Sequence, residues 1–177
     1  MKEDYAVVLD LLPNGYPLER KLMPIIQAIG KENFTLLELT PRKEAHIEIG
    51  EEVYIGEGKR EKIYYILGRL KRERLTETAK SRLKEIISER VRKNETEMVK
   101  FFNESAAINK RMHQIELLAG FGKKHMREIL KQREEKLFES FKEIKERVPN
   151  LPDPEKAIEK RIFQEMTELE KYNLFTA

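Results

Sequence analysis

Short apolar runs separated by turn-forming residues dominate the first part of the chain. Six such runs are rich in β-branched residues, leucine and tyrosine: residues 5–12, 24–29, 34–40, 45–49, 53–55 and 62–70. The pattern predicts about five short strands, with residues 30–33 as the turn of a hairpin. Residues 17–29 also fit a short helix, and periodicity alone leaves both alternatives open. Because a closed sheet has no free edges, we expect a small OB-like β barrel over residues 1–75.

Apolar residues recur at helical spacing from Thr76 onward, and no strand pattern follows. The hydroxyl group of Thr76 is expected to cap the first helix. The predicted helices cover residues 77–93, 95–104, 108–118, 123–135, 137–147 and 154–171. Three prolines between residues 149 and 154 separate the last two helices. The sequence therefore predicts an α+β protein in which an all-α domain, residues 76–177, follows the barrel without a flexible linker.

The composition narrows the class of protein. Charged residues make up 38% of the chain, mostly lysine and glutamate, a bias typical of heat-adapted proteins. Cysteine is absent, which excludes disulfide bonds and thiolate metal sites. The first residues lack the apolar core of a signal peptide, and no apolar run is long enough to cross a bilayer. We therefore expect a cytoplasmic protein from a thermophile, with no membrane partner.

Positive charge is concentrated in the middle of the sequence. Residues 1–58 carry 6 basic and 11 acidic side chains, residues 59–133 carry 21 and 10, and residues 134–177 carry 8 and 11. The middle segment thus has a net charge of +11, although the whole chain has only +3. Such asymmetry is typical of a surface that binds a polyanion, and a solvated Lys/Glu helix surface is the alternative interpretation.

Two glycines that flank a phenylalanine mark the candidate site, within Leu118–Leu130. An apolar helix is expected to end at Gly120, and Gly122 opens the next helix. Both glycines permit positive φ angles in a very tight turn. Their bare backbone also lets an anion approach the amide groups at the start of the second helix, where the helix dipole is positive.

Three cations follow this turn: Lys123, Lys124 and Arg127. Positive charge at a helix N-terminus opposes the helix dipole, so helix stability does not explain these cations, whereas a bound phosphate does. Phe121 is expected to point inward and to anchor the turn. A glycine-rich turn inside a helix bundle, without a ligand, is the alternative interpretation.

This spacing resembles the helix-hairpin-helix motif of DNA repair and replication proteins, and it places such a motif at about residues 108–135. In that family the backbone amides of the turn bind a phosphate without reading sequence. The resemblance implies this role for Gly120 and Gly122, with Lys123 and Lys124 as their charge partners.

Helix-hairpin-helix motifs often occur in pairs, and residues 148–158 fit a second turn of this kind. Asn150 and Pro152 stand there in place of glycines, and Asp153 stands in place of a lysine. A second turn at this position is therefore expected to pack against its surroundings and not to bind phosphate.

A second basic region, residues 59–74, surrounds two tyrosines. Its cations complete the predicted nucleic-acid-binding set: Lys59, Arg60, Lys62, Arg69, Lys71, Arg72 and Arg74. Strand alternation would place Tyr64 and Tyr65 on opposite faces, so at most one of them serves as a stacking surface. A basic strand with an exposed aromatic ring suits a single-stranded nucleic acid, while tyrosine in the barrel core is the alternative.

No pattern in the sequence indicates a catalytic or metal site. His46, His113 and His125 lie in different contexts without metal-ligand spacing. The chain lacks both the glycine-rich loop that binds nucleoside triphosphates and a serine nucleophile elbow. Asp153, the only aspartate after Asp10, stands among prolines and is expected to cap a helix. We therefore predict a protein that is not an enzyme and needs no cofactor.

The whole layout resembles an archaeal family of unknown function whose members are described as RNA-binding proteins. Residues 34–39, 53–63 and 118–124 carry this resemblance. It implies an OB-like barrel, a helix-hairpin-helix and RNA as the partner class. We predict that the protein binds nucleic acid along the phosphate backbone and with little sequence specificity. The barrel and the family favour RNA, whereas the helix-hairpin-helix resemblance favours DNA, so both partners stay open. The alternative is a protein-interaction module of a ribosomal or DNA-repair assembly.

Overall fold

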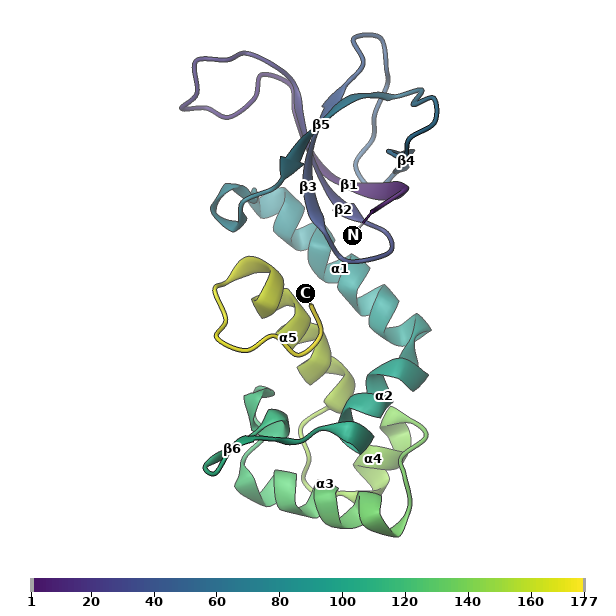
Figure 1. The fold of residues 1–177 in the computed structure, drawn as a ribbon, viewed down its shortest axis with the longest axis vertical. Helices are drawn as coiled ribbons and strands as arrows, with labels where there is room; N and C mark the ends of the chain where they lie inside the picture. Colours follow the sequence, from purple (N-terminus) through teal and green to yellow (C-terminus); the bar gives the residue numbers. More distant parts are fainter. Residues whose placement is uncertain (1, 177) are drawn as a thin grey trace. The chain divides into compact units, whose positions relative to one another are not determined.

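The chain divides into two compact units of an α+β protein (Figure 1). The computed structural model describes residues 2–176. One unit holds the residues up to Lys84 together with Met166–Leu169, and the other holds Glu85–Glu165 and Glu170–Phe175. The division falls inside helix α1 (Glu77–Lys93) and not at residue 75, because the contacts of the first turns of α1 group with those of the sheet.

The first unit is built on a five-stranded antiparallel sheet that curls into half a barrel (Figure 1). Its strands are β1 (Tyr5–Leu12), β2 (Ile25–Gly30), β3 (Leu36–Pro41), β4 (Glu52–Tyr54) and β5 (Ile63–Arg69), in the order β4-β1-β2-β3-β5. No ladder joins β4 to β5 within residues 2–176, so the expected closure of the barrel is wrong. The strand β4 has only three residues, and residues 45–49 form no strand, which leaves too little strand to bridge the two edges.

The central strands of this sheet are buried on both faces. The hydrophobic core lies on one face and includes Val8, Ile26, Leu39 and Ile63. Gln27 is fully buried, and its side-chain amide donates to the carbonyl oxygen of Arg74 at 2.6 Å and accepts from the amide of Thr76 at 3.1 Å. The Thr76 hydroxyl accepts the N–H of Ala79 at 3.0 Å, which confirms it as the cap of α1. Gln27 thereby fixes the start of α1 to the sheet.

Two bulges in β5 break the alternation expected of a strand. The paired residues are Ile63 with Pro41, Tyr65 with Thr40, Ile66 with Leu39 and Gly68 with Glu38. Tyr64 and Leu67 are therefore extra residues without a partner on β3. Because a bulge re-aims side chains, Tyr64 and Tyr65 are both exposed, at 66% and 58%. The alternative that tyrosine here belongs to the barrel core is therefore wrong, while the prediction that at most one of the two serves as a stacking surface stays a prediction.

The second unit combines the rest of α1 with α2 (Glu95–Glu104), α3 (Lys123–Glu135), α4 (Phe141–Arg147) and most of α5 (Pro154–Thr167). These bounds confirm the helices predicted at residues 77–93, 95–104 and 123–135. The helix α4 begins later than predicted because the Ser140 hydroxyl caps it, accepting the N–H of Glu143 at 3.0 Å. None of the helices within residues 2–176 combines the length and apolar character that a membrane span requires.

The helix predicted at residues 108–118 is wrong. This stretch forms a two-stranded ladder, β6 (Ala107–Asn109) and β7 (Met112–His113), followed by the 3₁₀ helix η2 (Gln114–Leu117). The side-chain oxygen of Asn109 accepts the N–H of Arg111 at 2.8 Å and closes the turn between the strands. Such local side-chain hydrogen bonds offer the backbone an alternative to a helix.

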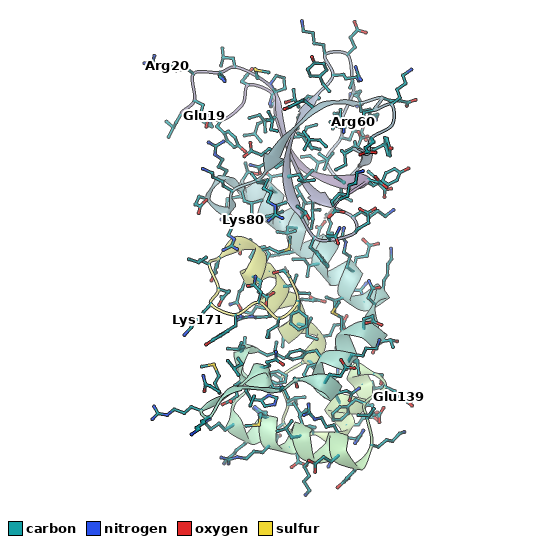
Figure 2. All side chains as sticks on the ribbon, in the orientation of Figure 1. Glu19, Arg20, Arg60, Lys80, Glu139 and Lys171 are labelled. Atoms are coloured by element: carbon teal, nitrogen blue, oxygen red, sulfur yellow. The ribbon has the colours of Figure 1, made fainter. Side chains whose placement is uncertain are left out.

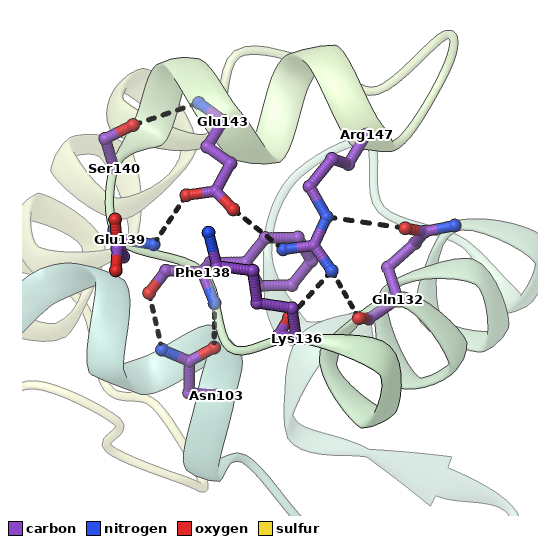
Figure 3. Close-up of polar contacts among 8 residues, drawn as sticks. All are labelled: Asn103, Gln132, Lys136, Phe138, Glu139, Ser140, Glu143 and Arg147. Atoms are coloured by element: carbon purple, nitrogen blue, oxygen red, sulfur yellow. Dashed lines mark hydrogen bonds and ion pairs between the residues drawn. The ribbon is translucent and has the colours of Figure 1, made fainter.

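Arg147 ties the end of α3 to α4 (Figure 3). Its Nη1 atom lies 2.9 Å from a carboxylate oxygen of Glu143, and its Nη2 atom donates to the carbonyl oxygens of Gln132 and Lys136, the latter at 2.7 Å. The guanidinium also lies 4.4 Å from the centre of the Phe138 ring. The Gln132 carbonyl also accepts the N–H of Lys136 at 3.1 Å, so Arg147 gives it a second donor and gives a donor to the carbonyl of Lys136, just beyond α3.

We expect Arg147→Lys to lower the free energy of unfolding by about 1–3 kcal/mol. The lysine ammonium is too compact to contact both carbonyl groups and the ring at once. Urea denaturation of the full chain measures the change. Lys145→Arg, on the exposed face of α4, is the matched control and should stay within about 0.5 kcal/mol of the parent. An equally small effect of both substitutions would contradict this role of Arg147.

Candidate functional site

The turn between η2 and α3 contains one glycine that the backbone requires and one that it does not. Gly120 has a φ angle of +82°, in the left-handed region that favours glycine. Gly122 has φ −102° and ψ −173°, so it does not use the positive φ angles that a glycine permits. A Cβ atom on Gly122 would meet nothing within 4 Å. Phe121 is only 5% exposed and lies 6.1 Å from the Phe102 ring, which confirms it as the anchor of the turn.

The first turn of α3 carries no negative charge of its own. Its N-cap, Gly122, supplies no side-chain oxygen, and its first turn contains no acidic residue. The other four α-helices of residues 2–176 each have an acidic residue in the first turn. Because the first amide groups of a helix lack intrahelical acceptors and the dipole is positive there, this end of α3 favours an anion.

The three cations of the hairpin differ in how they are used. Lys123 lies 3.2 Å from a carboxylate oxygen of Glu116 and donates to the carbonyl oxygen of Arg111 at 2.9 Å. It therefore holds the segment before the turn to the start of α3. Lys124 and Arg127 are exposed, and neither forms a hydrogen bond or ion pair with another residue in the part of the chain that the structure describes. These two cations are available to a ligand.

A second turn, between α4 and α5, packs against the first. Asn150 has a φ angle of +58°, and it lies thirty residues after Gly120, the positive-φ residue of the first turn. A Cβ atom on Gly120 would lie 3.2 Å from the ring of Pro152. Asp153 accepts the backbone N–H two residues further on at 3.0 Å, so it caps α5, as predicted. A carboxylate of the chain thus caps the start of α5, whereas no carboxylate caps the start of α3.

His125 joins the two turns. Its Nδ1 atom accepts the N–H of Gly122 at 3.1 Å, so its proton lies on Nε2, which donates to the carbonyl oxygen of Asn150 at 3.1 Å. The Gly122 amide is therefore occupied, although the resemblance to helix-hairpin-helix proteins assigned it to phosphate. The amides of Lys123 and Lys124 are among those of the first turn that have no acceptor within the described residues, and they are open to an anion. No sequence signal marks this bridge, because its partners are 25 residues apart.

The cations of the basic region form two groups at opposite ends of β5, a strand of seven residues or about 20 Å. Four of them form contacts within the first unit. Arg60 and Arg72 donate to backbone carbonyl oxygens, of Gly56 at 2.8 Å and of Glu168 at 2.5 Å. Lys62 and Arg74 pair with carboxylates, of Glu51 at 3.0 Å and of Glu19 at 2.6 Å. Lys59, Arg69 and Lys71 are exposed and unpaired within residues 2–176. Figure 2 labels Arg60 in the loop that precedes β5. The region is therefore not one continuous basic face.

The same substitution at the two glycines should have opposite effects on stability. Gly120→Ser should lower the free energy of unfolding by about 1–2 kcal/mol, because a side chain is strained at positive φ and meets Pro152. Gly122→Ser should leave it unchanged or raise it by a few tenths of a kcal/mol, because serine is a good N-cap residue in open space. Thermal unfolding of both variants measures the difference, and equal losses would refute the assignment.

His113 supports the segment that leads into the turn. Its buried Nδ1 atom accepts the N–H of Ile115 at 3.2 Å, a bond that requires an unprotonated Nδ1. Burial and, secondly, the nearby Arg133 guanidinium lower the pKa of His113 below its ordinary value. The neutral imidazole is therefore the form that the fold selects.

The lowered pKa of His113 predicts a loss of stability in acid. Between the unfolded-state pKa, about 6.5, and the lower folded-state pKa, the unfolded chain binds more protons, so the free energy of unfolding falls as the pH falls. His113→Asn keeps a capping acceptor without a titrating ring. Urea denaturation at pH 7.5 and pH 5 should show a smaller difference for this variant than for the parent. If the parent and the variant lost the same free energy of unfolding between pH 7.5 and pH 5, His113 would not be the source of the acid sensitivity.

Three comparisons relate the chain to known proteins. The family model "Protein of unknown function (DUF655)" matches residues 2–177. An uncharacterised protein of Methanocaldococcus jannaschii is 45% identical over 175 residues, 98% of this chain and 79% of that protein. The crystal structure of Af1531 from Archaeoglobus fulgidus, described with the same family, has 43% identity and a TM-score of 0.81, covering 99% of this chain and 100% of that one. None of these descriptions names RNA, so RNA as the partner stays a prediction.

Proposed function

The chain belongs to this DUF655 family, and from that starting point we propose that it binds nucleic acid, RNA in preference to DNA, along the phosphate backbone. The contacts that support the proposal involve backbone amides and cations, which recognise phosphate without reading bases. Little sequence specificity is therefore expected. The proposal needs no catalytic group, cofactor or metal.

The open N-terminus of α3 is the observation that carries this proposal. Four helices of the described chain neutralise their first turn with their own acidic residues, whereas α3 presents free amides, the dipole and two unpaired cations together. Lys124 and Arg127 would each cost helix stability at this end without an anion. A phosphate group has the charge and the acceptor oxygens that satisfy amides and cations at once.

In this proposal the turn before α3 and the start of α3 do the work of a helix-hairpin-helix, although the short 3₁₀ helix η2 stands in place of its first helix. The turn at residues 148–153 is the packing partner. The bridge from His125 to Asn150 supports a rigid pair of turns, and rigidity lowers the entropic cost of holding a ligand. The half-barrel acts as an OB-like surface, to which Lys59, Arg69 and Lys71 contribute charge.

Charge reversal at the two free cations tests the proposal. Lys124→Glu with Arg127→Glu should weaken binding to a 12-bp RNA duplex at least ten-fold in 100 mM salt, measured by fluorescence anisotropy. The slope of log affinity against log salt should fall by roughly 2, because two phosphate contacts are lost. The same measurement with a DNA duplex of equal length, and with single-stranded RNA and DNA, shows which nucleic acid the protein prefers.

The control reverses two exposed lysines of the same unit, Lys142 and Lys160, with the same change in net charge. This control should keep its affinity within about three-fold and its salt slope within about one of the parent. If both variants lost affinity equally, the loss would come from the overall charge of the protein, and a localised site would be contradicted. Absence of binding to every nucleic acid tested would overturn the proposal in favour of a protein-interaction module.

A further inference from the structure

A groove of about 770 Å³ opens on the first unit, between the loop at residues 13–24 and the loop that follows β3. Its walls are largely aliphatic and are formed in part by Leu11, Met23, Pro24 and Ile47. The loop at residues 13–24 extends away from the sheet, with Arg20 near its tip (Figure 2). The volume lies within the range of roughly 300–1,000 Å³ that is usual for pockets that bind ligands.

Tyr64 supplies the aromatic wall of this groove. It is one of the two extra residues of β5, lying between the pairs Ile63–Pro41 and Tyr65–Thr40. The bulge therefore directs toward the groove a ring that regular pairing would have placed elsewhere, and the ring is 66% exposed. An exposed aromatic ring beside an apolar wall is a surface on which a base stacks.

Two cations, Arg42 and Lys43, line the same groove, and no acidic side chain of the described residues lines it. The Arg42 Nε atom donates to the carbonyl oxygen of Arg60 at 2.8 Å, so its guanidinium is held in place. Lys43 is exposed and unpaired within residues 2–176. A ligand that matches this groove combines a flat apolar part with negative charge.

We propose that this groove binds unpaired nucleotides of a single-stranded nucleic acid. One base stacks on Tyr64 against the aliphatic wall, and the adjoining phosphates face Arg42 and Lys43. This inference rests on the proposed function, nucleic-acid binding, but it uses different residues and assigns a different substrate class. Inside a duplex both faces of a base are covered by the neighbouring base pairs, so a base there cannot stack on Tyr64.

Tyr64→Ala tests the groove without removing any buried group. Affinity for a 12-nucleotide oligouridine should fall roughly ten-fold, because one stacked base is lost, while affinity for a 12-bp RNA duplex stays within about two-fold. Tyr64→Phe should keep the parent affinity. Tyr65→Ala is the matched control, since Tyr65 is also exposed on β5 but does not line the groove. Thermal unfolding confirms that each variant folds.

The outcomes separate this inference from the proposed function. If Tyr64→Ala and Tyr65→Ala bind oligouridine like the parent, the groove assignment is overturned, whatever the hairpin variants do. If Tyr64→Ala alone loses oligouridine while Lys124→Glu with Arg127→Glu binds every probe normally, the groove stands and the hairpin proposal falls. Methyl NMR of Met23 and Ile47 adds a direct readout. Shifts on adding a Leu/Glu-rich 12-residue peptide, with none on adding oligouridine, would overturn the inference in favour of a peptide.

Discussion

Burial of the Phe121 ring decides where the backbone of the hairpin lies. The ring packs against Phe102, and its two glycine neighbours are left on the outside of the turn. From that position Gly122 caps α3 without a side chain of its own, and the first turn that follows contains no acidic residue. His125 then fixes the turn to Asn150. The packing of Phe121 thus places a helix start without an acidic residue at the end of a short turn, and the proposed phosphate binding depends on it.

Much of the positive charge in the middle of the sequence supports the fold and is not available to a partner. Arg74 pairs with Glu19, Lys123 pairs with Glu116, and Arg133 donates to carbonyl groups at the end of α2. Charge counting therefore overstates the binding surface. Few cations stay exposed and unpaired within the described residues, and Lys124 and Arg127 are among them. The positions of these few cations, and not the total charge, indicate where a polyanion binds.

Features decided by neighbouring residues were predictable from the sequence. Thr76 and Asp153 cap the helices that they precede, and Phe121 is buried between its glycines, because short-range hydrogen bonds and patterning determine these features. The bulges that expose Tyr64 were not predictable, since register depends on the partner strand. The bridge from His125 to Asn150 likewise exists only once the two turns have packed together.

The central claim is that phosphate binds at the start of α3, where the first turn has no acidic residue, and α5 offers an internal comparison. Amide NMR spectra of the full chain, recorded during titration with a 12-bp RNA duplex, test it most directly. The account predicts that the amide signals of Lys123 and Lys124 shift in proportion to binding, while those of Glu155 and Lys156, which Asp153 already caps, shift much less. Equal shifts at both helix starts, or none at α3 while the duplex is bound, would contradict it.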